Sequence, residues 1–92
     1  MAELEIVCIN KPDRQSPHEA INRYGLREST GVKSYPRQVV VDWVKEGNRA
    51  YVQDSIGKVY CQVRKSPAGT EFLQTVRDNR WTDNLLSLPE CR

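Results

Sequence analysis

The chain has 92 residues and a formal net charge of +2, from 14 Lys and Arg against 12 Asp and Glu. This length supports one hydrophobic core, so residues 1–92 are expected to form a single domain. No apolar run approaches the roughly 18 residues of a membrane span, and the small net charge does not single out nucleic acid as the partner.

The first predicted element is a strand over residues 3–9, where alternating residues give way to a continuous apolar run. A helix-start pattern follows, because the Ser16 side chain can accept a hydrogen bond from the Glu19 N–H and Glu19 can reach back. A short helix is therefore expected from Ser16 to about Tyr24, with Gly25 as its stop.

Residues 26–35 show no period and mix charges with Ser and Thr, so a connecting loop is expected there. A second helix is predicted over residues 36–46, capped by Ser34 or Tyr35 and stopped by Gly47. Its three consecutive valines favour a strand when taken alone. The apolar residues of the segment nevertheless fall on one helical face, which favours a helix.

The remainder predicts a meander of three strands over residues 49–53, 58–65 and 71–76, joined by Gly-containing and Pro-containing turns. From Asp78 onward, apolar residues lack a strand or helix pattern and are expected to lie across the sheet and close the core. The predicted fold class is therefore α+β: a small antiparallel sheet of about four strands, one N-terminal plus the meander, with two short helices.

The catalytic and metal-binding patterns sought in the sequence are absent. His18 falls in the first turn of a predicted helix, where an exposed side chain is ordinary. Three cysteines spread over the whole length are unlike the dense even sets of secreted domains, so reduced thiols are expected. Cys8 and Cys61 lie on apolar strand faces, whereas Cys91 is the more exposed candidate nucleophile. No metal site and no cofactor are predicted.

One face of the predicted middle strand interleaves an aromatic residue with basic ones. Such a face can follow phosphates and stack on a base, and it equally suits an acidic protein surface. A plain solvated sheet face is the alternative interpretation. The predicted binding residues are Lys58, Tyr60, Arg64 and Lys65, with Arg14 and Arg77 as outlying candidates.

Residues 8–14 (Cys-Ile-Asn-Lys-Pro-Asp-Arg), 18–21 (His-Glu-Ala-Ile) and 82–91 (Thr-Asp-Asn-Leu-Leu-Ser-Leu-Pro-Glu-Cys) look like a family of short bacterial and phage domains of unknown function. The resemblance covers nearly the whole chain. It departs at residues 24–28, since family members are expected to carry a Gly-Gly pair and a Trp there. The resemblance implies a compact α+β unit, no catalytic residues to transfer, and members carried by phages and other mobile elements.

Small phage proteins of this size are also similar in character to anti-CRISPR inhibitors, which occupy protein or guide-RNA surfaces of a host surveillance complex. We therefore expect a non-enzymatic binding protein that inhibits a host nucleoprotein defence complex in the bacterial cytoplasm. The N-terminal residues lack the basic and apolar regions of a signal peptide, in keeping with that compartment. The alternatives are a small nucleic-acid-binding regulator and a thiol-dependent enzyme that uses Cys91.

Overall fold

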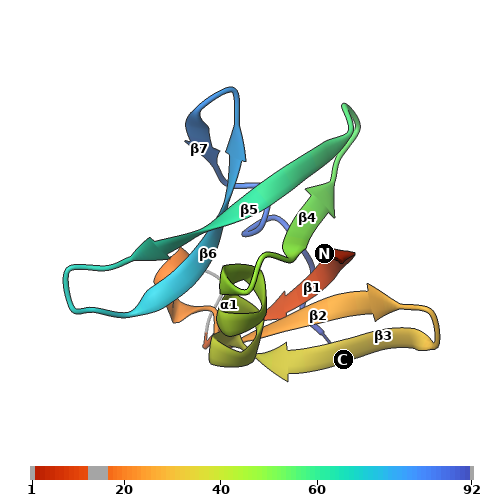
Figure 1. The fold of residues 1–92 in the computed structure, drawn as a ribbon, viewed down its shortest axis with the longest axis horizontal. Helices are drawn as coiled ribbons and strands as arrows, with labels where there is room; N and C mark the ends of the chain where they lie inside the picture. The colour runs from red at the N-terminus through yellow and green to blue at the C-terminus, as the bar shows by residue number, and fades with distance from the viewer. Residues whose placement is uncertain (1, 13–16, 92) are drawn as a thin grey trace.

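A computed structural model describes residues 2–12 and 17–91 of the protein (Figure 1). Seven strands form one mixed sheet in the order β3-β2-β1-β4-β5-β6-β7. A 3₁₀ turn, η1 (His18–Ala20), precedes β2, and an α-helix, α1 (Arg37–Lys45), follows β3. The strands are β1 (Glu3–Asn10), β2 (Arg23–Glu28), β3 (Gly31–Pro36), β4 (Arg49–Gln53), β5 (Lys58–Lys65), β6 (Glu71–Arg77) and β7 (Arg80–Thr82).

The helix α1 packs on one face of this sheet, which we call the inner face. Figure 1 shows α1 between the part formed by β1, β2 and β3 and the part formed by β4 to β7. Val40 and Val41 of α1 are buried in the core. Pro36 is the N-cap of the helix, and Gly47 follows its end with φ 105°, a conformation that glycine adopts without a steric cost. The inner face contributes Ile6, Leu26, Ala50, Val52, Cys61 and Leu73 to the same core.

A bulge in β1 explains the continuous apolar run of the first strand. Ile6 lies opposite Leu26, but Cys8 lies opposite Gly25, so β1 holds one more residue than β2 at this point. An extra residue reverses the alternation of side chains along a strand. Ile6 and Ile9 are therefore both fully buried in the core although they are three residues apart.

The second edge of β1 is shared by two partners. Residues 3–5 pair with β4 in parallel. Farther along, the Ile9 N–H donates to the Pro89 carbonyl at 3.0 Å, and the Cys91 N–H donates to the Ile9 carbonyl at 3.1 Å. The C-terminal segment thus continues the sheet where β4 leaves it, and a disulfide joins Cys8 to Cys91 in the same place.

The expectation of three reduced thiols is wrong, because Cys8 and Cys91 form this disulfide. Their bonded sulfurs lie against Gly25, where a Cβ atom would be 2.1 Å from the Cys8 Sγ and 2.7 Å from the Cys91 Sγ. Cys61 keeps its thiol and is a core residue as predicted, with its pKa raised to about 12 by burial. A thiol enzyme using Cys91 therefore lacks its nucleophile.

The disulfide also bears on the cellular compartment. Structural disulfides are typical of oxidising compartments and are rare in the cytosol. None of the helices in the described part of the chain is long and apolar enough to cross a membrane. Residence in the bacterial cytoplasm thus stays a prediction.

A hydrogen bond across the core joins two strands from opposite halves of the sheet. The hydroxyl of the fully buried Tyr24 in β2 accepts from the Leu73 N–H of β6 at 3.2 Å. In the sheet order β1, β4 and β5 separate these two strands. The sheet must therefore curl around the core to bring them into contact, and η1 also packs against β6.

The predicted α+β class with about four strands and two helices is wrong, because the protein is mostly sheet. The helix expected over residues 16–24 is not formed: Ser16 lies outside the described residues, η1 is a single turn, and Tyr24 already belongs to β2. His18, expected to be exposed, is buried. Gly25, interpreted as a helix stop, is instead the glycine on which the disulfide packs.

The loop expected over residues 26–35 is wrong as well. β2 and β3 form a hairpin there, with Glu28 opposite Gly31. The strand β3 lies at the sheet edge and is almost wholly exposed, so it carries no apolar period that a sequence pattern could reveal. The later elements were predicted well: the strands expected at 49–53 and 58–65 coincide with β4 and β5, and the helix over 36–46 contains α1.

The C-terminal segment was predicted correctly only in part. Leu85 is fully buried, as expected of a segment that closes the core. Asp78 and Asn79, however, have φ of 53° and 63° and form a two-residue turn into β7. Trp81 then lies on β7 with 45% of its surface exposed, rather than in the core.

Gly25→Ala tests the contact between β2 and the disulfide. The added methyl group would overlap both sulfurs, so we expect the free energy of unfolding to fall by about 1–3 kcal/mol. Urea denaturation under non-reducing conditions measures this loss. In a Cys8→Ala/Cys91→Ala background the same substitution should cost clearly less, and an equal cost in both backgrounds would contradict the contact.

Tyr24→Phe tests the tie between β2 and β6. The substitution leaves the buried Leu73 N–H without its acceptor, which costs about 1–3 kcal/mol of folding free energy. The control is Tyr51→Phe, because the Tyr51 side chain is only half-buried. Hydrogen exchange at the Leu73 amide should accelerate in Tyr24→Phe and stay unchanged in the control; unchanged exchange in both variants argues against the tie.

Candidate functional site

The outer face of the sheet, which turns away from α1, carries three of the predicted binding residues, Lys58, Tyr60 and Arg64. Register places Tyr51 of β4 opposite Tyr60 of β5, Tyr60 opposite Val76 of β6, and Val76 opposite Trp81 of β7. We call the following residues the outer basic face: Arg49, Tyr51, Lys58, Tyr60, Arg64 and Trp81. Lys65 lies opposite Glu71, which pairs with Lys45 of α1, so Lys65 belongs to the inner side at the end of β5.

Lys58 and Tyr60 lie together at one end of the outer basic face, as predicted. The Lys58 ammonium is 3.2 Å from a Glu3 carboxylate oxygen, and the Tyr60 hydroxyl donates to the same oxygen at 3.2 Å. The hydrogen bond from Lys58 lowers the pKa of Glu3, and Glu3 in turn raises the pKa of Lys58. Glu3 thus compensates part of the positive charge at this end.

At this end of the outer basic face, cation–π contacts link two cations to two tyrosine rings. The Lys58 ammonium lies 4.6 Å from the centre of the Tyr51 ring, and the Arg49 guanidinium lies 5.4 Å from the centre of the Tyr60 ring. The two tyrosine rings are 5.9 Å apart and tilted by 59°. Attraction between a cation and an aromatic face holds these side chains in a defined arrangement without neutralising the cations.

Arg64 forms the other end of the outer basic face with neutral neighbours. Its guanidinium lies 4.4 Å from the centre of the Trp81 ring and 5.8 Å from that of Phe72. It donates to the Gln74 side-chain oxygen at 2.7 Å. The positive charge of Arg64 is therefore oriented by these contacts, beside an exposed indole.

A polar hollow of about 360 Å³ adjoins Arg64. Arg64 and Lys65, two of the predicted binding residues, line it. The same hollow is lined by Pro17, His18, Ser66, Pro67, Phe72 and Gln74. Two cations and several hydrogen-bonding groups around one hollow suit an anionic group such as a phosphate.

The two outlying candidates do not join this face. Arg14 lies outside the described residues. Arg77 is held by Asp54 through two contacts of 2.9 Å, one to each carboxylate oxygen. Asp54 also accepts from the Ile56 and Gly57 N–H groups and from the Asn84 amide. Arg77 is therefore a structural residue that fixes the β4–β5 turn to β6.

Sequence reasoning missed Trp81 and gave Tyr51 no role. Trp81 was assigned to the core because the β6–β7 turn was not recognised. The pair Asp78-Asn79 between two β-forming segments is the sequence signal for that turn, since Asp and Asn tolerate positive φ. The pairing of Tyr51 with Tyr60 depends on strand register, which the sequence pattern left open.

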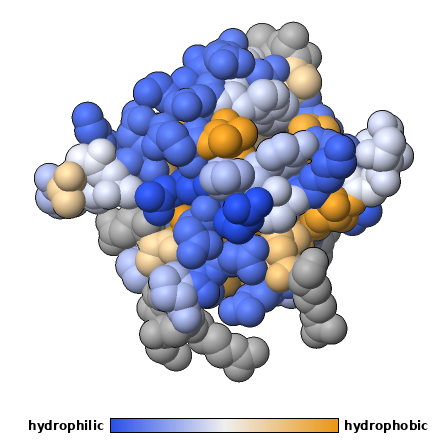
Figure 2. Space-filling model, turned by 90° about the horizontal axis from the view of Figure 1, so that it is seen from below, coloured by the Kyte–Doolittle hydropathy of each residue, from blue (hydrophilic) through white to orange (hydrophobic). Residues whose placement is uncertain are grey.

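The surface seen in Figure 2 is mainly hydrophilic, with small and separate hydrophobic patches. Stable obligate interfaces instead expose broad apolar patches. Among the described residues, no group of three or more His, Cys, Asp or Glu is placed to hold a metal ion.

Comparison with known proteins identifies the family. Residues 5–89 match the family described as "Protein of unknown function (DUF3892)". The chain belongs to the DUF3892 family. No curated protein and no solved structure matches the DUF3892 chain significantly. The resemblance to a family of unknown function is thus confirmed, whereas a bacterial or phage origin and an anti-CRISPR role stay predictions.

Asp54→Asn tests the structural role of Arg77. The Arg77 guanidinium and two backbone N–H groups hold the pKa of Asp54 well below its usual range. A carboxyl whose pKa is lowered by folding stabilises the protein above its unfolded-state pKa of about 3.9, and this stabilisation is lost as the pH falls. The wild type should therefore exceed Asp54→Asn in urea midpoint at pH 7, and the difference should shrink toward pH 2.

The matched control for this comparison is Asp83→Asn, because Asp83 is an exposed carboxyl. Its urea midpoint should stay close to that of the wild type at both pH values. A difference between wild type and Asp54→Asn that is constant from pH 7 to pH 2 would show that the Asp54 charge does not carry the effect.

Proposed function

We propose that this DUF3892 chain is a non-enzymatic binding protein whose outer basic face engages the RNA-bearing surface of a nucleoprotein complex. The observation that carries the proposal is the hollow lined by Arg64 and Lys65 beside the exposed indole of Trp81. Cations of this kind neutralise phosphates, and an exposed aromatic ring stacks on an unpaired base. Phosphates and unpaired bases occur together in single-stranded RNA.

Preorganisation of these side chains supports the proposal. The contacts of Arg64 with Trp81 and Gln74 restrict the guanidinium before any partner arrives. A side chain that is already ordered loses less conformational entropy on binding. At the opposite end, the exposed Arg49 over the Tyr60 ring extends the charged track along the sheet.

The more specific form of the proposal is inhibition of a host nucleoprotein defence complex by a phage or mobile-element protein, as anti-CRISPR proteins do. The likeness in size and end motifs suggests this setting. A guide RNA held in a surveillance complex offers the phosphates and accessible bases that suit the outer basic face. To act there, the protein must be folded in the bacterial cytoplasm. It must either form the Cys8–Cys91 disulfide in that compartment or keep its fold without it.

A small nucleic-acid-binding regulator is the second candidate, favoured by the same cations and rings. The two functions differ in whether the protein binds nucleic acid that is not part of a complex. A regulator binds free nucleic acid, whereas an inhibitor of a nucleoprotein complex binds the assembled complex more tightly than its isolated RNA.

Variants of the outer basic face test its role in binding. Trp81→Ala should lower affinity for a single-stranded RNA or for the complex by about 1–3 kcal/mol, through loss of stacking. Arg64→Gln should weaken binding and reduce the slope of log affinity against log salt by about 0.7 to 1. Lys33→Gln removes one cation from the inner side of the sheet and is the charge-matched control. Fluorescence anisotropy across a salt series measures these effects.

Undiminished affinity in both Trp81→Ala and Arg64→Gln, with both variants folded, would remove the outer basic face as the binding surface. The inhibitory function has its own test. Purified surveillance complex is mixed with target DNA and rising amounts of the protein, and target binding should fall. Full target binding at a large molar excess of protein would refute inhibition.

A further inference from the structure

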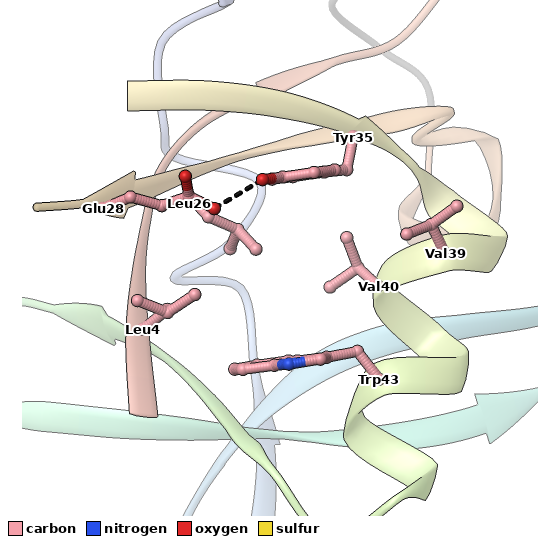
Figure 3. Close-up of a pocket in the computed structure, with 7 residues that line it drawn as sticks. All are labelled: Leu4, Leu26, Glu28, Tyr35, Val39, Val40 and Trp43. Carbon is pink, nitrogen blue, oxygen red and sulfur yellow. Dashed lines mark hydrogen bonds between the residues drawn. The ribbon is translucent and has the colours of Figure 1, made fainter. Parts of the chain in front are cut away.

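A second cavity lies on the inner side of the sheet, between α1 and the strands β1, β2 and β3 (Figure 3). Its volume is about 160 Å³. An apolar protein cavity of about 150 Å³ holds a molecule the size of benzene. The lining residues are Leu4, Leu26, Glu28, Tyr35, Val39, Val40 and Trp43.

Two aromatic rings bound this cavity. In Figure 3 the rings of Tyr35 and Trp43 lie on opposite sides of it and are both seen nearly edge-on, so that a face of each ring is turned to the space between them. Leu26 and Val40 project into the region between the rings. Aromatic faces carry negative electrostatic potential and attract cations, most strongly where water is excluded.

Glu28 supplies a negative charge to the lining. The Tyr35 hydroxyl donates a hydrogen bond to its carboxylate, which directs Glu28 toward the cavity (Figure 3). This contact with Glu28 raises the pKa of Tyr35, so that the phenol remains a donor. Lys33 is the nearby cation, but its ammonium is 3.8 Å from the carboxylate and its side chain is 61% exposed. That separation exceeds a hydrogen bond, so Lys33 compensates Glu28 only weakly.

The cavity is open to solvent at α1. Val39 in the first turn of the helix is 51% exposed although it lines the cavity. A ligand can therefore enter without unfolding of the helix. The aliphatic residues of the lining would contact its hydrocarbon part, and the rings and carboxylate would contact its charge.

We propose that this cavity binds a compact alkylammonium group, such as a trimethylammonium head, between Tyr35 and Trp43 with Glu28 as its counter-ion. A trimethylammonium group is a bulky cation that fills an apolar space while it interacts with aromatic faces. Such a group belongs either to a free quaternary amine or to a methylated lysine side chain. The site lies on the sheet side opposite to the outer basic face, so it is independent of the proposed function.

The test compares choline with its neutral isostere, 3,3-dimethylbutan-1-ol. The indole N–H resonance of Trp43 reports binding, and Trp81→Phe identifies that resonance because the chain has two tryptophans. Choline should shift the resonance saturably and bind about 3- to 30-fold more tightly than the isostere. Equal affinity for the two compounds, or no shift of the Trp43 signal at any choline concentration, would overturn the proposal.

Two substitutions at the cavity should act in opposite directions. Glu28→Gln should weaken choline binding several-fold and leave the isostere unaffected, because only the counter-ion is lost. Lys33→Gln should strengthen choline binding slightly, because it removes an ammonium that compensates Glu28 only weakly. Thermal melts confirm that both variants fold. Unchanged choline affinity in both folded variants would contradict the role of Glu28.

The source of the ammonium group is distinguished by a peptide that carries trimethyllysine. Displacement of choline by this peptide, and not by its unmethylated form, assigns the site to a modified side chain. Binding of choline without binding of the peptide assigns it to a free amine. RNA binding by the outer basic face should be the same with and without choline, which separates this inference from the proposed function.

Discussion

The extra residue in β1 decides how the two parts of the sheet meet. Before the bulge, Ile6 points into the core and β1 pairs with β4. After the bulge, Ile9 takes the core side and Cys8 turns outward to Gly25 and Cys91. In a regular strand Cys8 would share the face of Ile6, and the disulfide would have to form within the core. The bulge therefore places the disulfide, and the pairing of residues 89–91 with β1, on the side of the sheet away from Ile6 and Ile9.

The strands β4 and β5 could be predicted from the sequence because they alternate cleanly and are separated by turn residues. Local patterns failed in the first half for physical reasons. The hairpin of β2 and β3 lies at the sheet edge and is held mainly by backbone pairing, which leaves little apolar pattern. Gly25 was predicted to end a helix, whereas a glycine is needed at this position because the disulfide packs against it. Such contacts between distant residues are invisible to a local pattern.

The candidate site was predictable to a similar degree. Alternation along β5 correctly placed Lys58, Tyr60 and Arg64 on one face, since that inference needs only the strand period. The residues that contact this face are determined by strand register and sheet topology, which a local sequence pattern does not give. The contact of Glu3 with Lys58 was unforeseen because Glu3 comes from β1, 55 residues away in sequence. The position of Trp81 was unforeseen because the turn at Asp78 and Asn79, which have positive φ, was not recognised. The ion pair of Arg77 was unforeseen as well, because its partner Asp54 is likewise remote in sequence.

The shared edge of β1 has a consequence for the order of folding. This strand is made before all of its partners, which lie in residues 23–27, 49–51 and 89–91. Contacts so distant in sequence cost loop-closure entropy before they stabilise the chain, and they slow folding. During synthesis the part of β1 beyond the bulge keeps an unpaired backbone edge until residues 89–91 emerge. At that stage the growing chain is most exposed to pairing with the strands of other molecules.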